Sequence, residues 1–354
     1  MAVYTTIDDP GLFVNPLLYT GTGAIQSITG VGFAPAMAWF KSRTSVASHQ
    51  LYDTVRGNAS ALVPSTAAAA IDATGDGFTS LDSDGYTFNA GGGGGNVNAS
   101  QDFIAWNWGA GTTSGITTDG STTITPSAYS FNTTSGFAVL KYTGNITSGA
   151  KLAHGLGAVP TMIICKNIDN ADSWAVGHRS MDVTIPWDYA LNLDTNAARD
   201  NSDSYWNDTA PDSVNITLGN GDNTNRAALI VAYCFTEKQG YSSFGRYLGT
   251  GDADISPFVY TGFRPAYVLY KKSSATEQWF LNDNKRLGYN PDNEYLFSDT
   301  DAVEGTANRI EFLSNGFRIT TTDGGANTSG ATYIYMAFAE APLVNSEGVP
   351  GNAR

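Results

Sequence analysis

The chain has few charged residues, and few of those are basic. Only 15% of its 354 residues are charged, and 19 Lys and Arg stand against 33 Asp and Glu, for a net charge of −14. A nucleic-acid-binding protein needs a basic face to neutralise phosphates, and anionic membranes attract the same charge. We therefore expect neither nucleic acid nor an anionic membrane as a partner, and we interpret the acidity as a contribution to solubility.

Long apolar runs are also absent. The longest, Ala227 to Phe235, has nine residues, whereas a membrane-spanning helix needs about 20. The opening residues, MAVYTTIDDP, lack the basic start and apolar stretch of a secretory signal. We expect synthesis in a cytoplasm without membrane insertion, so a role outside the cell requires release by lysis or inside an assembly.

Cysteine and histidine are scarce. Cys165 and Cys234 lie in apolar strand-like runs, where a free thiol behaves as a small hydrophobe, and a reducing compartment gives a disulfide no support. None of the three histidines has a second histidine at a metal-ligand spacing, and the chain has no Gly-x-Ser-x-Gly nucleophile elbow. We predict a protein that is not an enzyme and that uses no cofactor.

One segment is rich in aspartate. Residues 72–85, DATGDGFTSLDSDG, contain Asp72, Asp76, Asp82 and Asp84. Calcium takes oxygen ligands from such loops, but the spacing differs from that of an EF-hand loop and the closing glutamate is missing. We retain the four aspartates as weak candidates for a metal site and prefer the alternative that they are solvated turn residues.

One pattern of residues occurs three times along the chain. A proline is followed by a lysine six residues later and by a ring-bearing residue eight positions after the lysine. The prolines are Pro35, Pro160 and Pro265; the lysines are Lys41, Lys166 and Lys271; the ring positions are His49, Trp174 and Trp279. Twelve residues after the lysine stand Asp53, His178 and Asp283. Several concordant spacings indicate one module present in three copies.

Short aromatic and β-branched runs, separated by Gly, Asn, Asp and Pro, predict about eight strands in each copy. That number in about 100 residues is typical of a β-sandwich or jelly roll. We predict an all-β chain of three tandem β-sandwich, jelly-roll-like repeats and leave open whether they form a rod or a compact cluster. The expected boundaries are an N-terminal arm with repeat 1 (1–110), a polar linker with room for one strand at 122–125 (111–135), repeat 2 (136–237), repeat 3 (238–342) and a C-terminal tail (343–354).

Two further features bear on binding and stability. Trp187 and Trp206, with the adjacent Tyr205, occur only in the second copy and are flanked by polar residues. An exposed aromatic ring is suited to stacking on a sugar, so we consider these three as glycan-binding candidates; the alternative is that they fill a packing junction.

Asp53 with Arg56 and Asp283 with Arg286 share a spacing of three, which favours an ion pair or a backbone clamp.

Several motifs carry a resemblance. The opening YTTIDDPGLFVNPLLYTGTG, the segment LYDTVRG (51–57) and the segment VAYCFTEKQGYSSFGRYLGTG (231–251) resemble virion proteins of marine tailed phages. These are built from copies of a domain of unknown function and are often labelled tail fibre or tail proteins. The resemblance covers most of residues 7–342 and implies a setting in the virion, with release by lysis; it supplies no catalytic residues.

Together these observations predict a non-enzymatic phage structural protein, most simply a tail fibre or spike component that attaches to a host-surface glycan or receptor. The expected partners are other virion proteins, of tail or capsid, and further copies of the chain, with a trimer as the default for a fibre. One alternative is a capsid decoration or head-fibre protein. Another is a polysaccharide-degrading enzyme, which requires paired carboxylates in a cleft.

Overall fold

The computed structural model describes residues 4–73, 77–91, 97–286, 290 and 294–351. Strands contain 43% of the residues and helices 5%, which confirms the all-β prediction. The helical elements are single turns: η1 (Pro10–Leu12), η2 (Pro186–Asp188), α1 (Asp203–Trp206), α2 (Asp222–Asn225) and α3 (Gly324–Asn327). In the described part of the chain no helix has the length and apolarity needed to cross a bilayer.

The strands fall into three consecutive groups, here named unit 1 (14–109), unit 2 (110–237) and unit 3 (238–342), each with one large and one small antiparallel sheet. In unit 1 the large sheet is β1 (Val14–Thr20), β9 (Asp102–Gly109), β3 (Pro35–Ser42) and β4 (Gln50–Asp53), and the small sheet is β2 (Gln26–Thr29), β8 (Gly85–Phe88) and β7 (Phe78–Asp82). A further pair joins β5 (Ser60–Ala61) to β6 (Ile71–Asp72).

Units 2 and 3 follow the same plan. In unit 2 the large sheet is β10 (Ala128–Asn132), β11 (Phe137–Thr143), β18 (Leu229–Phe235), β13 (Met162–Asn167), β14 (Ala175–His178), β15 (Tyr189–Asn192) and β16 (Asp200–Asn201), and the small one is β12 (Ala150–Ala153) and β17 (Asn215–Leu218). In unit 3 the large sheet is β19 (Ser242–Leu248), β27 (Thr332–Pro342), β21 (Phe263–Lys272), β22 (Trp279–Asp283), β23 (Glu294–Phe297) and β24 (Gly305–Thr306), and the small one is β20 (Phe258–Tyr260), β26 (Gly316–Ile319) and β25 (Ile310–Leu313).

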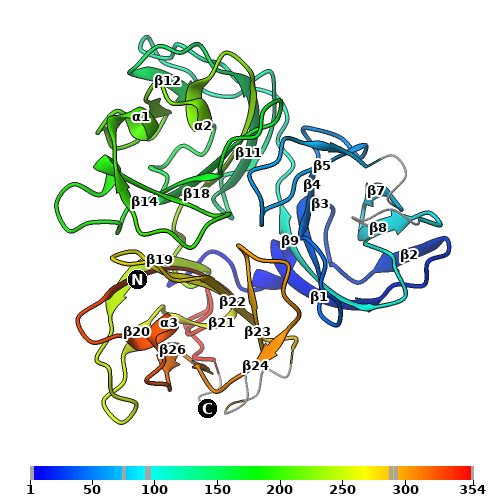
Figure 1. Ribbon diagram of the computed structural model, residues 1–354, viewed down its shortest axis with the longest axis vertical. Coiled ribbons are helices and arrows are strands. Elements are labelled where there is room, and N and C mark those ends of the chain that lie inside the picture. Colours follow the sequence, from blue (N-terminus) through cyan, green and yellow to red (C-terminus); the bar gives the residue numbers. More distant parts are fainter. Residues whose placement is uncertain (1–3, 74–76, 92–96, 287–289, 291–293, 352–354) are drawn as a thin grey trace.

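The large sheets are covered on both faces. All eight residues of β3 are buried, whereas the edge strand β1 alternates between buried and accessible positions. One face of each large sheet packs on an aromatic cluster inside its own unit. The opposite faces meet in a shared core to which all three units contribute, and Figure 1 shows the units as a triangle around it. The arrangement is a compact cluster and not a rod.

Two expectations about segments are wrong. The segment 111–135 contains β10, which pairs with β11 along Ala128–Asn132 and so belongs to the large sheet of unit 2. Residues 122–125 form no strand; Ile124 makes only an isolated parallel bridge to Leu152. The Gly, Ser and Thr composition suggested a free linker, but sheet pairing uses backbone groups that every non-proline residue has.

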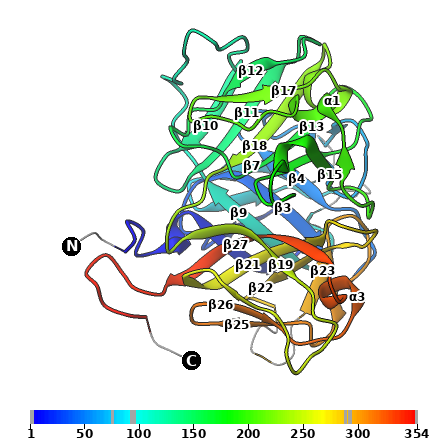
Figure 2. The ribbon, with the colours of Figure 1, turned by 90° about the vertical axis from the view of Figure 1, so that its left-hand side faces the viewer.

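The N-terminal arm and the C-terminal tail meet. The carboxylate of Asp8 accepts hydrogen bonds from the backbone N–H and hydroxyl of Ser346, the first at 2.6 Å. Figure 2 shows the blue N-terminal arm and the red C-terminal segment projecting on the same side of the molecule.

Candidate functional site: the seams between the three units

The centre of the triangle is filled by large side chains. A cavity of only about 10 Å³ remains there, lined by residues of all three units, among them Trp108, Tyr233 and Tyr267. That volume is at or below the size of a single water molecule. The centre is therefore a packed core that joins the units, and it offers no room for a ligand.

The ring positions eight residues after each lysine bond across the seams in a cyclic pattern. Trp174 of unit 2 donates its indole N–H to the carbonyl oxygens of Val63 (3.2 Å) and Thr66 (3.1 Å) of unit 1. Trp279 of unit 3 donates to the carbonyl of Asn192 of unit 2 at 2.9 Å. In unit 1 the place is taken by His49, whose Nε2 lies 2.8 Å from the carbonyl of Phe297 in unit 3.

The positions twelve residues after each lysine close the ring in the opposite sense. Asp53 of unit 1 accepts a hydrogen bond of 2.6 Å from the Tyr233 hydroxyl of unit 2. His178 of unit 2 bonds through Nε2 to the carbonyl of Tyr335 in unit 3 at 3.1 Å. Asp283 of unit 3 accepts a 3.0 Å bond from the Trp106 indole of unit 1. Two cyclic sets of bonds, each made by three equivalent positions, thus join unit 1 to 2, 2 to 3 and 3 to 1.

The Asp–Arg pairs predicted from sequence hold these acceptors in place. Arg56 bonds to Oδ2 of Asp53 at 2.7 Å, and Arg286 bonds to Oδ2 of Asp283 at 2.7 Å. In each pair Oδ1 of the aspartate also accepts the backbone N–H of the arginine. Both interpretations, ion pair and backbone clamp, are therefore confirmed in the same residues.

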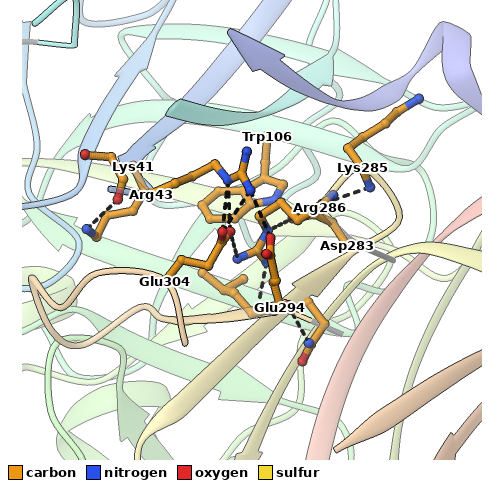
Figure 3. A network of polar contacts seen from close by, with 11 residues as sticks. Lys41, Arg43, Trp106, Asp283, Lys285, Arg286, Glu294 and Glu304 are labelled. Atoms are coloured by element: carbon orange, nitrogen blue, oxygen red, sulfur yellow. Dashed lines mark hydrogen bonds and ion pairs between the residues drawn. The ribbon is translucent and has the colours of Figure 1, made fainter. Parts of the chain in front are cut away.

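The seam between units 1 and 3 carries an ion network (Figure 3). Arg43 of unit 1 contacts Glu304 at 2.8 Å and Glu294 at 2.9 Å, both in unit 3. Arg286 contacts Glu304 from within unit 3 at 3.2 Å. Burial and the neighbouring Glu304 raise the pKa of Glu294. Burial also acts to raise the pKa of Glu304, but its hydrogen bonds with Arg43 and Glu294 and the nearby arginine charges together lower it.

The three repeat lysines are buried, and among the described residues none of them forms an ion pair. Each Nζ donates to the carbonyl of the next residue, at 2.8 Å for Lys41, 2.9 Å for Lys166 and 2.6 Å for Lys271. Lys41 also reaches the Asp301 carbonyl of unit 3, and Lys166 the Ala67 carbonyl of unit 1. Burial lowers the pKa of each lysine to about 8. These amines bind main-chain oxygens and face no cleft.

The tryptophans considered for glycan binding lie in the interior. Trp206 is 0% and Trp187 5% exposed, and their rings make an edge-to-face contact at 5.9 Å inside unit 2. The expected exposed stacking face is therefore wrong for these two residues, and the packing alternative describes them. Tyr205 is partly buried against the same cluster. The polar flanking residues misled the prediction because they form the short helical turns that cover these rings.

The described aspartates of the segment 72–85 lie in a turn or in the strands beside it: Asp84 in the turn, Asp82 at the end of β7 and Asp72 in β6. Asp84 accepts the backbone N–H groups of Gly30 and Gly32, at 3.1 and 2.6 Å, and Asp82 accepts hydroxyl bonds from Ser80 and Thr87. Asp72 lies exposed in β6, and Asp76 is outside the described residues. Within the described ranges no three His, Cys, Asp or Glu side chains gather to hold a metal.

Cys165 and Cys234 are free and buried, as predicted. They lie in the neighbouring strands β13 and β18, where Cys234 is opposite Ile163 and Cys165 opposite Ala232. Burial raises the pKa of the Cys165 thiol to about 12 and raises that of Cys234 as well. Both thiols behave as small apolar side chains.

Sequence reasoning had aligned the seam positions but had not recognised them as seam contacts. One signal was available in the sequence. The position eight residues after the lysine is His in one copy and Trp in the other two, and the position twelve residues after it is His in one copy and Asp in the other two. Such exchanges indicate that each position needs a large or charged side chain with a polar atom.

Residues 9–342 match one protein family, described as Domain of unknown function (DUF7483). The chain belongs to the DUF7483 family. This single match spans all three units, so the triangle as a whole, with its seams, corresponds to the family's domain. No curated protein and no solved structure matches the chain.

Proposed function

We propose that this DUF7483 protein is a non-enzymatic structural component of a phage particle, mounted on the tail as part of a fibre or spike that attaches to the host surface. The observation that carries the proposal is the use of the chain's polar groups. Most of the polar residues that stood out in the sequence bond to a neighbouring unit, namely Lys41, His49, Asp53, Lys166, His178 and Asp283. Arg56 and Arg286 hold the two aspartates in place. Such a body suits a rigid building block better than a catalyst.

The setting in a virion rests on the resemblance of the opening residues and of the segment 231–251 to tail proteins of marine phages. A compact body with a packed centre and all-β units is suited to an exposed appendage, since its large sheets are buried on both faces and meet in a core that all three units share. The partners are other virion proteins and a host glycan or receptor.

A capsid decoration protein is the second candidate, and the triangular arrangement favours it. Three similar units around a common axis match the local symmetry of a site where three capsid subunits meet. A polysaccharide-degrading enzyme has no such support: the paired glutamates Glu294 and Glu304 are bound by arginines within a seam.

Localisation on purified particles tests the proposal. Gold-labelled antibody against the purified protein is expected to decorate tails, and soluble protein at micromolar concentration is expected to reduce adsorption of the phage to its host. Labelling confined to heads, with adsorption unchanged, would replace the tail assignment by capsid decoration. Absence of the protein from particles, or release of reducing sugars from host polysaccharide by the protein alone, would refute the structural role.

A further inference from the structure

The small sheets expose equivalent edges in the three units. In each, an outer strand of the small sheet pairs with a later strand of the same unit: β2 with β8, β12 with β17 and β20 with β26. These pairings align Ser27 with Lys151 and Phe258. Two residues further on, they align Thr29 with Ala153 and Tyr260, and at both positions the backbone groups point away from the paired strand. The three edges therefore present the same geometry with different side chains.

In unit 2 this edge is occupied by another part of the chain. The N–H groups of Thr123 and Ile124 both donate to the carbonyl of Lys151 at 2.9 Å, and the N–H of Ala153 donates to the carbonyl of Ile124 at 3.1 Å. The N–H of Lys151 bonds to the Thr123 hydroxyl at 2.7 Å. Residues 122–124 thus lie along β12 in the parallel direction and satisfy its outward backbone groups.

In unit 3 no strand covers the same edge in the described part of the chain. The nearest contact comes from Tyr4, whose hydroxyl donates to the Gly262 carbonyl at 2.8 Å and lies 3.4 Å from the Tyr260 hydroxyl. Ile319 donates to Pro257 and Thr261 donates to Asn315, so the odd-numbered residues of this stretch face β26. Since neighbouring residues of a strand point their backbone groups in opposite directions, those of Phe258 and Tyr260 point outward. No bond to these outward groups is present in the part of the chain that the structure describes. Figure 1 shows β20 away from the centre of the triangle.

The open edge also carries unusual side chains. Phe258 is 48% and Tyr260 56% exposed, both on the outer face of the small sheet, whereas Ser27 and Thr29 stand there in unit 1. Arg318, opposite Phe258 on β26, is also half exposed and pairs with Glu311 at 2.9 Å. Two exposed aromatics on an unpaired edge are a combination that proteins normally avoid unless a partner covers them.

We propose that the β20 edge binds an extended polypeptide segment of a partner protein, which adds to the small sheet of unit 3 as a parallel strand. The segment 122–124 on β12 shows the kind of occupant this edge geometry accepts. The partner segment would resemble it, with hydroxyl and β-branched residues to cover Phe258 and Tyr260 and an acidic residue for Arg318. Main-chain bonds supply the affinity and the aromatic rings the selectivity. The inference goes beyond the proposed function, since it applies to a tail or a capsid partner alike.

A peptide taken from the chain itself is the probe. The peptide TDGSTTITPS (118–127), which covers the edge of unit 2, is titrated at millimolar concentration into the isotope-labelled full-length protein. We expect amide shifts confined to residues near 257–262 and 315–319. Phe258→Pro removes one outward N–H without touching the bonds to β26, so it should weaken binding about tenfold while the melting temperature stays close to that of the wild type.

Two matched variants complete the design. Phe258→Thr keeps the N–H and is expected to weaken binding less than Phe258→Pro, and Ser27→Pro, at the equivalent edge of unit 1, should leave binding unchanged. The proposal is overturned if the peptide shifts no amides at this edge, or if Phe258→Pro binds as the wild type does. It is equally overturned if the protein self-associates through this edge and the peptide does not compete.

Discussion

Trp106 of unit 1 donates its indole N–H to Oδ2 of Asp283 in unit 3 at 3.0 Å, and the same oxygen accepts Arg286 at 2.7 Å. One carboxylate therefore links a seam between units to an arginine that is itself fully buried. This relationship predicts that loss of the aspartate destabilises the protein more than loss of its tryptophan partner.

Asp283→Ala should lower the free energy of unfolding by about 3–5 kcal/mol, because it leaves the buried Arg286 with only part of its charge compensation. Trp106→Phe should cost about 1–3 kcal/mol, since Arg286 keeps its carboxylate and only one bond and some packing are lost. Urea denaturation followed by fluorescence measures both. Asp254→Ala, at an exposed loop position, is the control; an Asp283→Ala variant as stable as this control contradicts the proposed linkage.

Acid should loosen the seams through His49 and His178. In each, Nδ1 accepts a hydrogen bond, from the Trp39 indole at 2.8 Å and from the Ser180 N–H at 3.0 Å, so neither ring can take up a proton without losing a partner. Burial lowers the pKa of both to about 3. In the unfolded chain these histidines take up a proton near pH 6.5. The free energy of unfolding should therefore fall by up to about 1.4 kcal/mol per pH unit for each histidine as the pH falls from 6.5 toward 3.

Melting temperatures between pH 7 and pH 4 measure this effect. A His178→Gln variant, which keeps a hydrogen-bonding side chain without a titrating ring, should show a shallower decline than the wild type. Equal slopes for the two proteins would mean that carboxylates alone cause the acid sensitivity.

Pro16 should protect the edge of unit 1. Pro16 of β1 is equivalent to Val139 of β11 and to Phe244 of β19. The edge at Val139 is covered by β10. At Phe244 the backbone N–H donates to Glu237, and the carbonyl accepts a bond from Arg179. Pro16 has no N–H to offer a further strand. Pro16→Val should therefore produce concentration-dependent association, measured by light scattering, whereas Pro16→Lys, which restores the N–H beside a charge, should remain unassociated.

Gly177 should tolerate no side chain. A Cβ at this position would lie 2.6 Å from Cζ3 of Trp187 and 2.7 Å from Cε2 of Trp206, both buried. Gly177→Ala should therefore destabilise the protein by about 1–3 kcal/mol through overpacking. Gly120→Ala, where a Cβ has open space, is the matched control and should be neutral. If both variants melt at the same temperature, the two tryptophans are more mobile than their packing indicates.

The strand class and the Asp–Arg clamps could be predicted from the sequence because they depend on residues that are close together in the chain. The recurring prolines and lysines, the alternating apolar runs and the Asp–Arg spacing all act over a few residues, and the sheet class and the Asp53–Arg56 and Asp283–Arg286 clamps followed from them. The prediction that Trp187 and Trp206 are exposed was wrong, and so was the prediction that residues 111–135 form a linker. Both errors concern what covers a segment, which depends on residues distant in sequence.

By itself the sequence determined that the chain is a β protein with three similar parts and two inert thiols, because backbone periodicity and turn chemistry are set by neighbouring residues. Only the tertiary structure decided that the parts close into a triangle, and that His49, Trp174 and Trp279 bond across its seams. Seam contacts depend on relative orientation, and orientation is fixed by the summed burial of all three large sheets rather than by any one segment.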